Sequence, residues 1–403
     1  MESLKTLMIF STILSTILLI ASSPAFSQEQ HGDGTLTIPF ELSRNHIIIP
    51  VTVDDSEPLK MILDTGMPME GAVLIGGPRV DELRLESVGK AMVGGAGGGQ
   101  TEADLATGIT LGVAGLELTD QMVIVMPHDT TRSNVFEEHG VIGYSLFNRY
   151  VVRIDYVKHV ITLIEPDKFT YEGSGQELPI KFRNNFALLE CSVELIGGAK
   201  VPLELAVDTG ASHALSLNVG SDDDIIIPDT AVEFILGRGI SNSIYGNIGR
   251  IKSLQLGDIT VKNAITSFQS GQSGASSCTS RNGNLGNDLL RRFVVTFDYA
   301  GERMILEPGG HFDTPFEFNM AGMAYVKTGG GNFRIDFILK DSPAGDSGLK
   351  VNDVVTSING NPSEQLKIGD LDELLKKEGT RVDLHVTRGE KNLELSLKLR
   401  RLI

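Results

Sequence analysis

The sequence predicts a mainly β protein with two repeated lobes and a small α+β domain at its C-terminal end. The first observation is an Asp-Thr-Gly tripeptide that occurs twice, at 64–66 and 208–210, each time after an apolar run. The second is a series of segments rich in β-branched residues, such as 46–53, which are separated by turns. The third is a change of pattern after Gly309-Gly310, where the repetition stops.

The chain up to about residue 308 consists of two tandem copies. Residues that follow the first Asp-Thr-Gly recur 143 positions later: Gly143 and Gly286, Leu146 and Leu289, Arg149 and Arg292, Asp155 and Asp298, Tyr156 and Tyr299. Upstream, Ile38-Pro39-Phe40 is similar to Leu178-Pro179-Ile180. The duplication gives each copy one aspartate at the end of an apolar strand.

Two carboxylates in equivalent positions indicate a shared chemical task. Copies related by an approximate twofold axis can bring Asp64 and Asp208 together at their interface. Because like charges in near contact do not both ionise easily, we expect the pair to share one proton. One carboxylate can then deprotonate a water molecule while the protonated one polarises an amide carbonyl. The pattern predicts amide hydrolysis without a covalent intermediate.

Both motifs resemble those of the aspartic peptidases of the pepsin and retropepsin type, over roughly residues 35–308. The resemblance implies a two-lobed, pseudo-twofold aspartic-peptidase β-barrel fold with Asp64 and Asp208 as the catalytic residues. It also implies a set of residues that support the dyad, in which the Thr hydroxyls lock the two loops together. These are Thr65, Gly66, Thr209 and Gly210.

Members of this family also thread an apolar-apolar-Gly segment through each aspartate loop. Val141-Ile142-Gly143 fits this pattern, and Asn284-Leu285-Gly286 departs from it at its first position. Met67-Pro68 is a second departure, where small residues are usual. Neither copy has Ser or Thr after the Gly, which is similar to the retropepsins. Fewer hydrogen bonds to the ionised form predict a less acidic dyad.

The most glycine-dense segment, 93–100, matches by position the hairpin flap that closes over substrate in this family. Its flap residues would be Gly94, Gly95, Gly97 and Gly98. No Gly-Lys-Ser or Gly-Lys-Thr follows, which excludes a phosphate-binding P-loop. An exposed surface loop is the alternative interpretation. In the second copy the corresponding segment is about 236–250.

The C-terminal segment resembles a PDZ domain of the circularly permuted bacterial kind. The residues that carry the resemblance are Ser342-Pro343-Ala344, Gly348-Leu349, Asp353, and Asn359-Gly360. Such a domain binds an extended peptide as an added strand and holds its terminal carboxylate on backbone amides. By position the carboxylate loop would be Ala321, Gly322 and Met323, and a helix at about 370–377 would complete the groove through Leu371 and Leu374. Packing on the catalytic unit alone is the alternative.

Residues 1–27 have the features of a secretory signal, with cleavage expected after Ser27 and an uncleaved anchor as the alternative. The expected domains are therefore an N-terminal lobe at 28–168, a C-terminal lobe at 169–312 and the PDZ domain at 313–403. An exported protein, periplasmic or secreted, follows from the signal.

Composition excludes several classes of function. A net charge of −17 without Lys or Arg clusters argues against nucleic-acid binding. The eight His residues form no zinc-binding motif, so no metal or other cofactor is expected, and His213 is interpreted as structural or cleft-lining. Cys191 and Cys278 are compatible with one disulfide or with two separate thiols.

The sequence thus predicts an exported aspartic endopeptidase, a hydrolase that acts on peptide or protein substrates. Because one chain carries both aspartates, we expect a monomer. The PDZ domain would capture peptides or protein C-termini. The alternative is a non-catalytic peptide-binding protein with a decayed dyad.

Overall fold

The computed structural model describes residues 29–30, 34–94, 100–128, 137–198, 200–238, 243–270 and 280–403. Strands account for 51% of the structure and helices for 8%. The prediction of a mainly β protein is therefore confirmed. The predicted signal segment at 1–27 lies outside the described residues.

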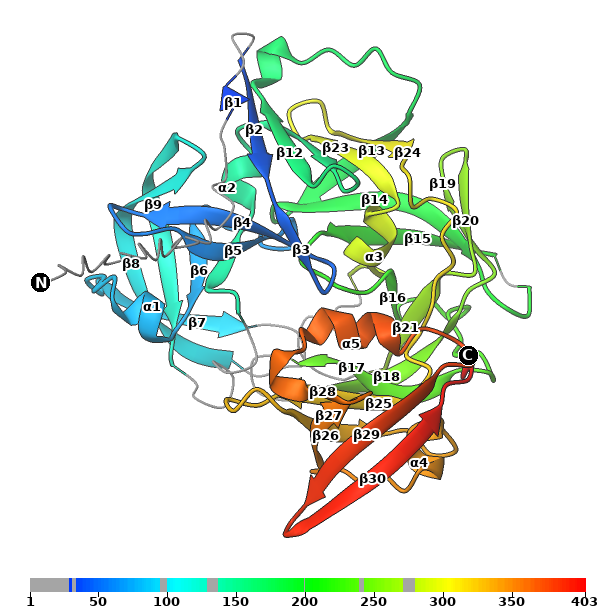
Figure 1. The fold of residues 1–403 in the computed structure, drawn as a ribbon. Helices are drawn as coiled ribbons and strands as arrows, with labels where there is room; N and C mark the ends of the chain where they lie inside the picture. Colours follow the sequence, from blue (N-terminus) through cyan, green and yellow to red (C-terminus); the bar gives the residue numbers. More distant parts are fainter. Residues whose placement is uncertain are drawn as a thin grey trace, which may run out of the picture.

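An eight-stranded sheet forms most of the first half of the chain (Figure 1). Its central strand, β5, is rich in apolar residues, is buried at four of its five positions and ends directly before Asp64. In spatial order the strands are β3 (Glu41–Ser43), β4 (His46–Val53), β5 (Leu59–Leu63), β10 (Gly140–Ile142), β6 (Ala72–Ile75), β9 (Leu116–Met126), β8 (Gln100–Val113) and β7 (Gly89–Gly94).

A second, larger sheet contains strands from both halves. The halves join where β11 pairs with β23 in antiparallel register, and Arg153 there faces Thr296, which lies 143 positions later. The main path is β1 (Glu29–Gln30), β2 (Thr35–Pro39), β12 (Val160–Ile164), β11 (Val151–Asp155), β23 (Phe293–Asp298), β24 (Arg303–Pro308), β13 (Gln176–Arg183), β14 (Phe186–Glu194), β15 (Lys200–Asp208), β22 (Gly283–Gly286), β16 (Leu215–Asn218), β21 (Ile265–Gln269), β18 (Ser243–Arg250) and β17 (Val232–Arg238). The pair β19 (Ser253–Leu256) and β20 (Ile259–Lys262) branches from β14.

Strand pairing repeats around the two aspartates. In the first half β5 runs parallel to β10, which pairs antiparallel with β6. In the second half β15 runs parallel to β22, which pairs antiparallel with β16. A short helix follows each threading strand, α2 (Tyr144–Phe147) in the first half and α3 (Asn287–Leu290) in the second. The duplication in sequence is thus a duplication in topology.

The C-terminal segment forms its own six-stranded sheet with a separate hydrophobic core. The strands in order are β25 (Met323–Lys327), β26 (Phe333–Ile338), β27 (Val354–Ile358), β29 (Arg381–Arg388) and β30 (Lys391–Lys398), with β28 (Asn361–Pro362) on β27. Short helices complete the fold: α1 (Pro78–Asp81) in the first half, and α4 (Pro343–Asp346) and α5 (Ile368–Leu374) in this domain.

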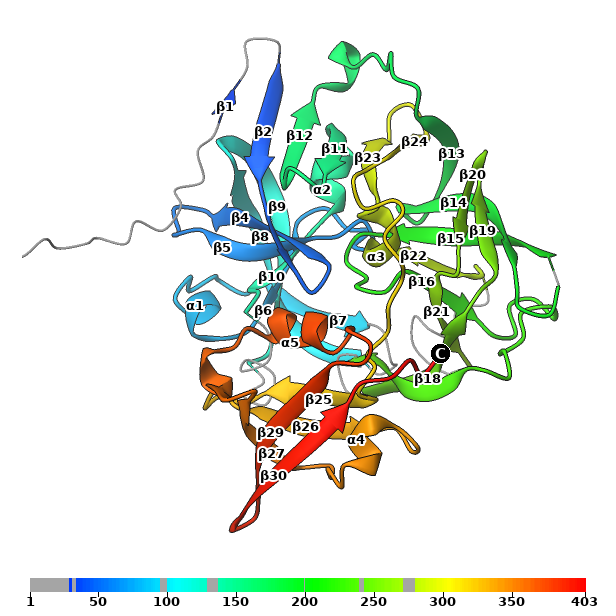
Figure 2. The same cartoon turned by 45° about the vertical axis from the view of Figure 1, so that its right-hand side comes forward.

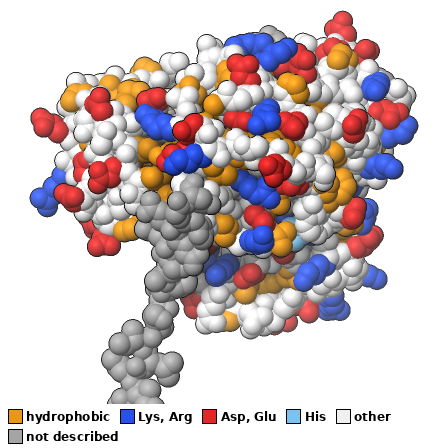
Figure 3. All heavy atoms as spheres, turned by 90° about the horizontal axis from the view of Figure 1, so that it is seen from above, with side chains coloured by type: hydrophobic (Ala, Val, Ile, Leu, Met, Phe, Trp, Pro, Cys, Tyr) orange, Lys and Arg blue, Asp and Glu red, His pale blue; other side chains and the backbone are white. Residues whose placement is uncertain are grey.

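Both ribbon views place the C-terminal domain against the two halves rather than at a distance from them (Figures 1 and 2). Helix α5 lies on the side of the domain that faces the halves, and the β29–β30 hairpin points away from them. Acidic and basic side chains are interspersed over the face shown in Figure 3. Among the described residues, no helix has the length and apolar character needed to cross a bilayer.

One ion pair anchors the core of the C-terminal domain. Arg388 Nε and Nη2 each donate to a different oxygen of the buried Asp353 carboxylate, both at 2.7 Å. The Lys350 N–H also donates to Asp353, at 2.8 Å. Burial by itself raises the pKa of Asp353, but these hydrogen bonds outweigh burial and leave the pKa below its ordinary value. The carboxylate therefore favours the folded state in its ionised form.

We expect Arg388→Met to destabilise the C-terminal domain by about 3 kcal/mol at neutral pH, because the buried carboxylate loses its charged partner. Arg381→Met is the matched control, since Arg381 and Asp383 form an exposed pair, and it should leave the stability of the domain nearly unchanged. Amide hydrogen exchange in β27 and β29 measures both effects. Because the pKa of Asp353 is lowered, the effect should be full above the ordinary pKa of an Asp, about 3.9, and shrink at more acidic pH. Equal protection in the two variants would contradict this expectation.

Candidate active site

The two Asp-Thr-Gly loops meet at the interface of the halves through a reciprocal exchange of hydrogen bonds. Each Thr hydroxyl accepts from the backbone N–H of the other Thr, both at 3.0 Å. The Thr65 hydroxyl donates to the Val207 carbonyl at 2.7 Å, and the Thr209 hydroxyl donates to the Leu63 carbonyl at 2.8 Å. Both Thr side chains are buried. The predicted support role of Thr65 and Thr209 matches where they lie.

This exchange brings the two carboxyl groups into contact. A side-chain hydrogen bond joins Asp64 to Asp208. The inner oxygen of Asp64, Oδ1, also accepts from the N–H groups of Gly66 at 2.6 Å and Gly210 at 3.2 Å. Burial, and after it the neighbouring Asp208 carboxylate, hold the pKa of Asp64 well above its ordinary value. Two acids that are distant in sequence are thus in hydrogen-bond contact.

The glycines of the motif are required by close approach. A Cβ on Gly66 would lie 2.8 Å from Asp208 Oδ1 and 2.9 Å from Asp64 Oδ1. A Cβ on Gly210 would collide with the Asp64 carboxyl group. Any side chain at either position would therefore push the two acids apart.

Both threading segments lie where the sequence placed them. Val141-Ile142 belongs to β10, and the Asp64 N–H donates to the Ile142 carbonyl at 2.9 Å. Asn284-Leu285-Gly286 belongs to β22, whose register sets Gly286 opposite Asp208. Each segment fixes the backbone on which one of the acids stands.

Asn284 turns out to be part of the site, although the sequence showed it only as a departure from an apolar pattern. Its Nδ2 donates to Asp208 Oδ2 at 2.8 Å. Its Oδ1 accepts from Arg281 Nε at 3.2 Å, which fixes the orientation of the amide. The equivalent position in the first half is Val141, which has no polar side-chain atom. The dyad therefore receives a side-chain hydrogen bond on one side only.

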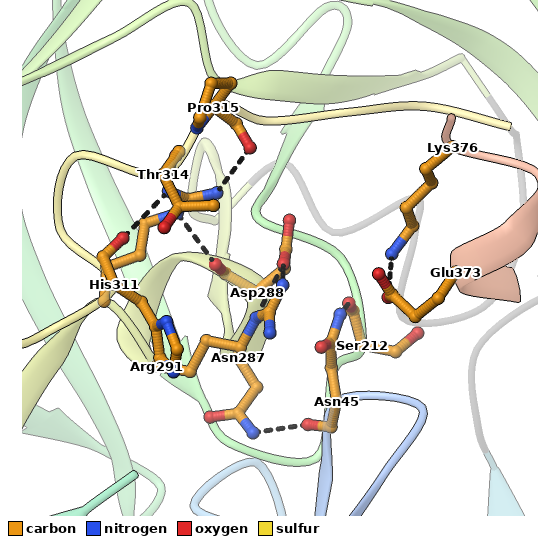
Figure 4. Close-up of polar contacts among 11 residues, drawn as sticks. Asn45, Ser212, Asn287, Asp288, Arg291, His311, Thr314, Pro315, Glu373 and Lys376 are labelled. Atoms are coloured by element: carbon orange, nitrogen blue, oxygen red, sulfur yellow. Dashed lines mark hydrogen bonds and ion pairs between the residues drawn. The ribbon is translucent and has the colours of Figure 1, made fainter. Parts of the chain in front are cut away.

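A second reciprocal contact clamps the two halves. Asn45 and Asn185 each lie in a tight turn between antiparallel strands and have positive φ angles of 67° and 63°. Asn45 Nδ2 donates to the Ser212 carbonyl at 2.8 Å, and Asn185 Nδ2 donates to the Pro68 carbonyl at 2.9 Å. Each turn thus holds the loop that follows the other half's aspartate. Figure 4 shows the Asn45 side of this clamp, where Asn287 also bonds the Asn45 carbonyl. Sequence reasoning missed both turns.

Two histidines near Asp208 are neutral at neutral pH. Burial, followed by the charge of Arg44, lowers the pKa of His46 to about 4. Burial also lowers the pKa of His213, despite the nearby Asp208 and Asp288 carboxylates. Both residues line the cavity described next. His213 is thus cleft-lining, in line with the expectation, and neither ring neutralises the acidic pair.

A cavity of about 500 Å³ opens above the two carboxyl groups. Its walls come from both halves, including Arg44 and His46, the loop after Asp208 and the β17–β18 hairpin, and from the C-terminal domain. From the hairpin come Phe234, Ile235, Leu236, Gly237 and Ile244; from the C-terminal domain come Asn319, Met323, Ala324, Tyr325, Val326 and Asp372. Its size is that of a ligand site.

Most of the predicted flap lies outside the described residues. Gly94 ends β7, while Gly95, Gly97 and Gly98 lie outside the described residues. The described part of the β7–β8 hairpin contributes nothing to the cavity, and the second hairpin lines it instead. Position along the chain pointed to the first hairpin because it carries the glycines.

The predicted carboxylate loop is already occupied by a side chain of the protein. Asn319 Oδ1 accepts from the N–H groups of Ala321 at 3.0 Å and Gly322 at 3.1 Å. Asn319 Nδ2 donates to the Met323 carbonyl at 2.8 Å. Two of the amides expected to bind a peptide carboxylate are therefore satisfied internally.

The remaining expectations concern metals and cysteines. Within the part of the chain that the structure describes, no three His, Cys, Asp or Glu side chains cluster as metal ligands would. Cys191 lies on β14, and burial raises the pKa of its thiol to about 12. Cys278 lies outside the described residues, so the choice between a disulfide and two thiols stays open.

Comparison with known protein families identifies one region of the chain. Residues 335–388 match the PDZ domain family, from within β26 to the end of β29. PDZ domains generally bind peptides or protein C-termini, so this match indicates peptide or protein binding. The search of curated proteins gave no match for the chain.

We expect Thr209→Val to destabilise the protein by about 2 to 4 kcal/mol, because it leaves the buried Thr65 N–H and Leu63 carbonyl without their partner. Thr209→Ser keeps the hydroxyl and should stay within about 1 kcal/mol of the wild type. Urea unfolding followed by far-UV circular dichroism measures both, since the chain has no Trp. A Val variant as stable as the Ser variant would show that the exchange does not hold the halves together.

Proposed function

We propose that this protein is an aspartic endopeptidase that activates water between Asp64 and Asp208. One observation carries the proposal: the buried exchange between Thr65 and Thr209 sets both carboxyl groups in hydrogen-bond contact on the floor of a cavity. The cavity wall includes both polar groups and apolar side chains, which suits an extended peptide.

The pseudo-twofold aspartic-peptidase fold is supported by contacts that repeat between the halves. The same strand pairing surrounds both aspartates. The β11–β23 register sets Arg153 opposite its own equivalent, Thr296. The clamps made by Asn45 and Asn185 are likewise reciprocal. An approximate twofold axis between the halves would account for the strand pairing, the β11–β23 register and the reciprocal asparagine contacts together.

The hydrogen bonds assign different roles to the two acids. Asn284 donates to Asp208, which favours the ionised form of that carboxylate. Asp64 has a raised pKa and so holds the shared proton. In the proposed reaction Asp208 takes a proton from water, and the water oxygen attacks the amide carbonyl carbon. The Asp64 proton goes to the carbonyl oxygen, which gives a tetrahedral diol. The C–N bond then breaks as the nitrogen takes the proton held by Asp208, and one diol hydroxyl returns its proton to Asp64, which yields the amine and the carboxylic acid.

Export and peptide capture complete the proposal. The signal-like segment at 1–27 supports an exported location, periplasmic or secreted. The PDZ domain supports recognition of a peptide or protein chain. Both lobes in one chain support action as a monomer, without any cofactor.

A non-catalytic peptide-binding protein is the second candidate. It is favoured by one observation, the PDZ match, because that match indicates binding and not hydrolysis. The two candidates differ in whether Asp64 is needed for turnover.

We expect Asp64→Asn to reduce peptide hydrolysis by about 10²- to 10⁴-fold, since the dyad loses its acid. Cleavage of denatured casein, followed by mass spectrometry with and without pepstatin, measures this. The variant should fold well: because the pKa of Asp64 is raised, its contribution to stability is present at low pH and is lost as pH rises through the folded value. Asp64→Asn is therefore expected to be at least as stable as the wild type at neutral pH. Peptide binding by a wild type that never cleaves would favour the second candidate.

We expect Asn284→Val, which copies the equivalent Val141, to shift the acidic limb of the kcat/KM profile to higher pH, because the ionised dyad loses a hydrogen bond. A lost hydrogen bond to a charged group costs about 1.5 to 3 kcal/mol, which corresponds to a roughly 10- to 100-fold lower kcat/KM on that limb. Asn284→Gln should recover part of the loss. Val141→Ala is the control on the other side of the dyad and should leave the limb in place. An unshifted limb in Asn284→Val would show that Asn284 does not set the protonation of the pair.

A further inference from the structure

The peptide-binding side of the PDZ domain and the two carboxyl groups share one cavity. Four consecutive residues of β25, Met323 to Val326, line the same 500 Å³ space as Asp64 and Asp208. Asp372 of α5 lines it as well. A chain lying along β25 therefore lies in front of the dyad.

Strand β25 offers a backbone edge to this cavity. It is the outermost strand of its sheet and pairs only with β26 in the described structure. Strand β17, which also lines the cavity, is the outermost strand of the large sheet. Edge strands carry unpaired N–H and C=O groups that bind an extended peptide as an additional strand. The cavity is thus lined by two edge strands, of which β25 belongs to the C-terminal domain.

Contacts with both halves hold the domain in this orientation. Arg44, in the β3–β4 turn, forms an ion pair with Asp372 at 3.2 Å. Asp372 also accepts from the Tyr325 hydroxyl, so the pair is tied to β25. From the second half, the ring of Phe234 in β17 packs edge-on against Phe337 in β26, with 5.0 Å between the ring centroids. These contacts hold the groove between β25 and α5 toward the two carboxyl groups in the folded protein.

The end of the groove is closed to a peptide carboxylate. A terminal carboxylate would need the N–H groups of Ala321 and Gly322, and Asn319 Oδ1 accepts from both. The Asn319 amide also bonds the Met323 carbonyl, at the start of β25. The side chain thus takes the place that the free end of a peptide would occupy.

We propose that β25 forms one wall of the substrate site and binds an internal, extended segment of a polypeptide, not its free C-terminus, while that segment crosses Asp64 and Asp208. This rests on the proposed function for the cleavage step but not for binding. Apolar side chains fit the segment best, because Met323, Val326, Leu236 and Ile244 are among the walls.

Binding to the full-length Asp64→Asn variant tests the proposal without turnover. The probe is the fluorescein-labelled peptide Gly-Ser-Ala-Leu-Phe-Ala-Ser-Gly, made with a free and with an amidated C-terminus, and anisotropy gives the Kd. We expect both forms to bind with the same Kd within about threefold. Adding Ala324→Trp to Asp64→Asn fills the cavity at β25, so we expect the Kd of both peptide forms to rise at least tenfold. Glu394→Trp, on the exposed outer strand β30, should leave both unchanged.

A second pair of variants tests the closed end of the groove and does not depend on Ala324→Trp folding. Asn319→Ala frees the two N–H groups, so the free-acid peptide should bind at least fivefold more tightly than the amide. Asn319→Asp keeps an acceptor oxygen and should show no such preference.

Three results would overturn the proposal. The first is that amidation of the peptide weakens its binding to Asp64→Asn tenfold. The others are that folded Ala324→Trp in this variant binds the peptides as tightly as Asp64→Asn alone, or that Asp64→Asn binds neither peptide. A wild type that binds both forms through β25 but cleaves no peptide would overturn the proposed hydrolysis and leave this binding site standing. If the wild type cleaves the peptide and Ala324→Trp does not change the rate, the proposed binding site at β25 is overturned and the proposed hydrolysis stands.

Discussion

The exchange of hydrogen bonds between Thr65 and Thr209 is the constraint on which the rest of the site depends. Each hydroxyl satisfies a buried N–H and a buried carbonyl of the opposite half. Loss of either hydroxyl would leave a buried N–H and a buried carbonyl without partners, at a cost of about 1 to 3 kcal/mol each. The exchange therefore holds the two loops together. The aspartates that directly precede Thr65 and Thr209 are placed in contact as a result. Burial at this interface, and after it the neighbouring Asp208 carboxylate, raise the pKa of Asp64.

The site is symmetric in its backbone and asymmetric in its side chains. Backbone pairing, the Thr exchange and the Asn45 and Asn185 clamps repeat across the interface. Asn284 has no polar counterpart at Val141, so Asp208 accepts a hydrogen bond from its threading strand that has no equivalent at Asp64. The absence of Ser or Thr after either Gly suggested a dyad with few hydrogen bonds. In the structure one such bond is supplied from the threading strand, and the neutral His46 and His213 leave the charge of the pair uncompensated.

The C-terminal domain adds a wall to the cleft that a two-lobed unit would lack. Its edge strand β25 and its helix α5 face the carboxyl groups, and Arg44 ties the helix to the first half. The β17–β18 hairpin packs on the same domain through Phe234. In the proposed function, recognition of a chain and access to the dyad involve the same cavity. In the proposed binding site, Asn319 takes the place of a free chain end.

The sequence alone determined the duplicated strands and the two aspartates, because these depend on local patterns: β-branched runs, Asp-Thr-Gly after an apolar strand, and recurrence at a fixed offset. The expected strand at 46–53 has those bounds in the structure. Only the tertiary structure decided the roles of Asn284, Asn319, Asn45 and Asn185, and it showed that β17 and β25 line the cavity, whereas most of the glycine-rich segment lies outside the described residues. An asparagine amide can donate and accept hydrogen bonds with many groups, so its partners depend on which groups the fold places near it. For these four residues, contacts between loops and domains place the partners, and no local sequence pattern predicts them.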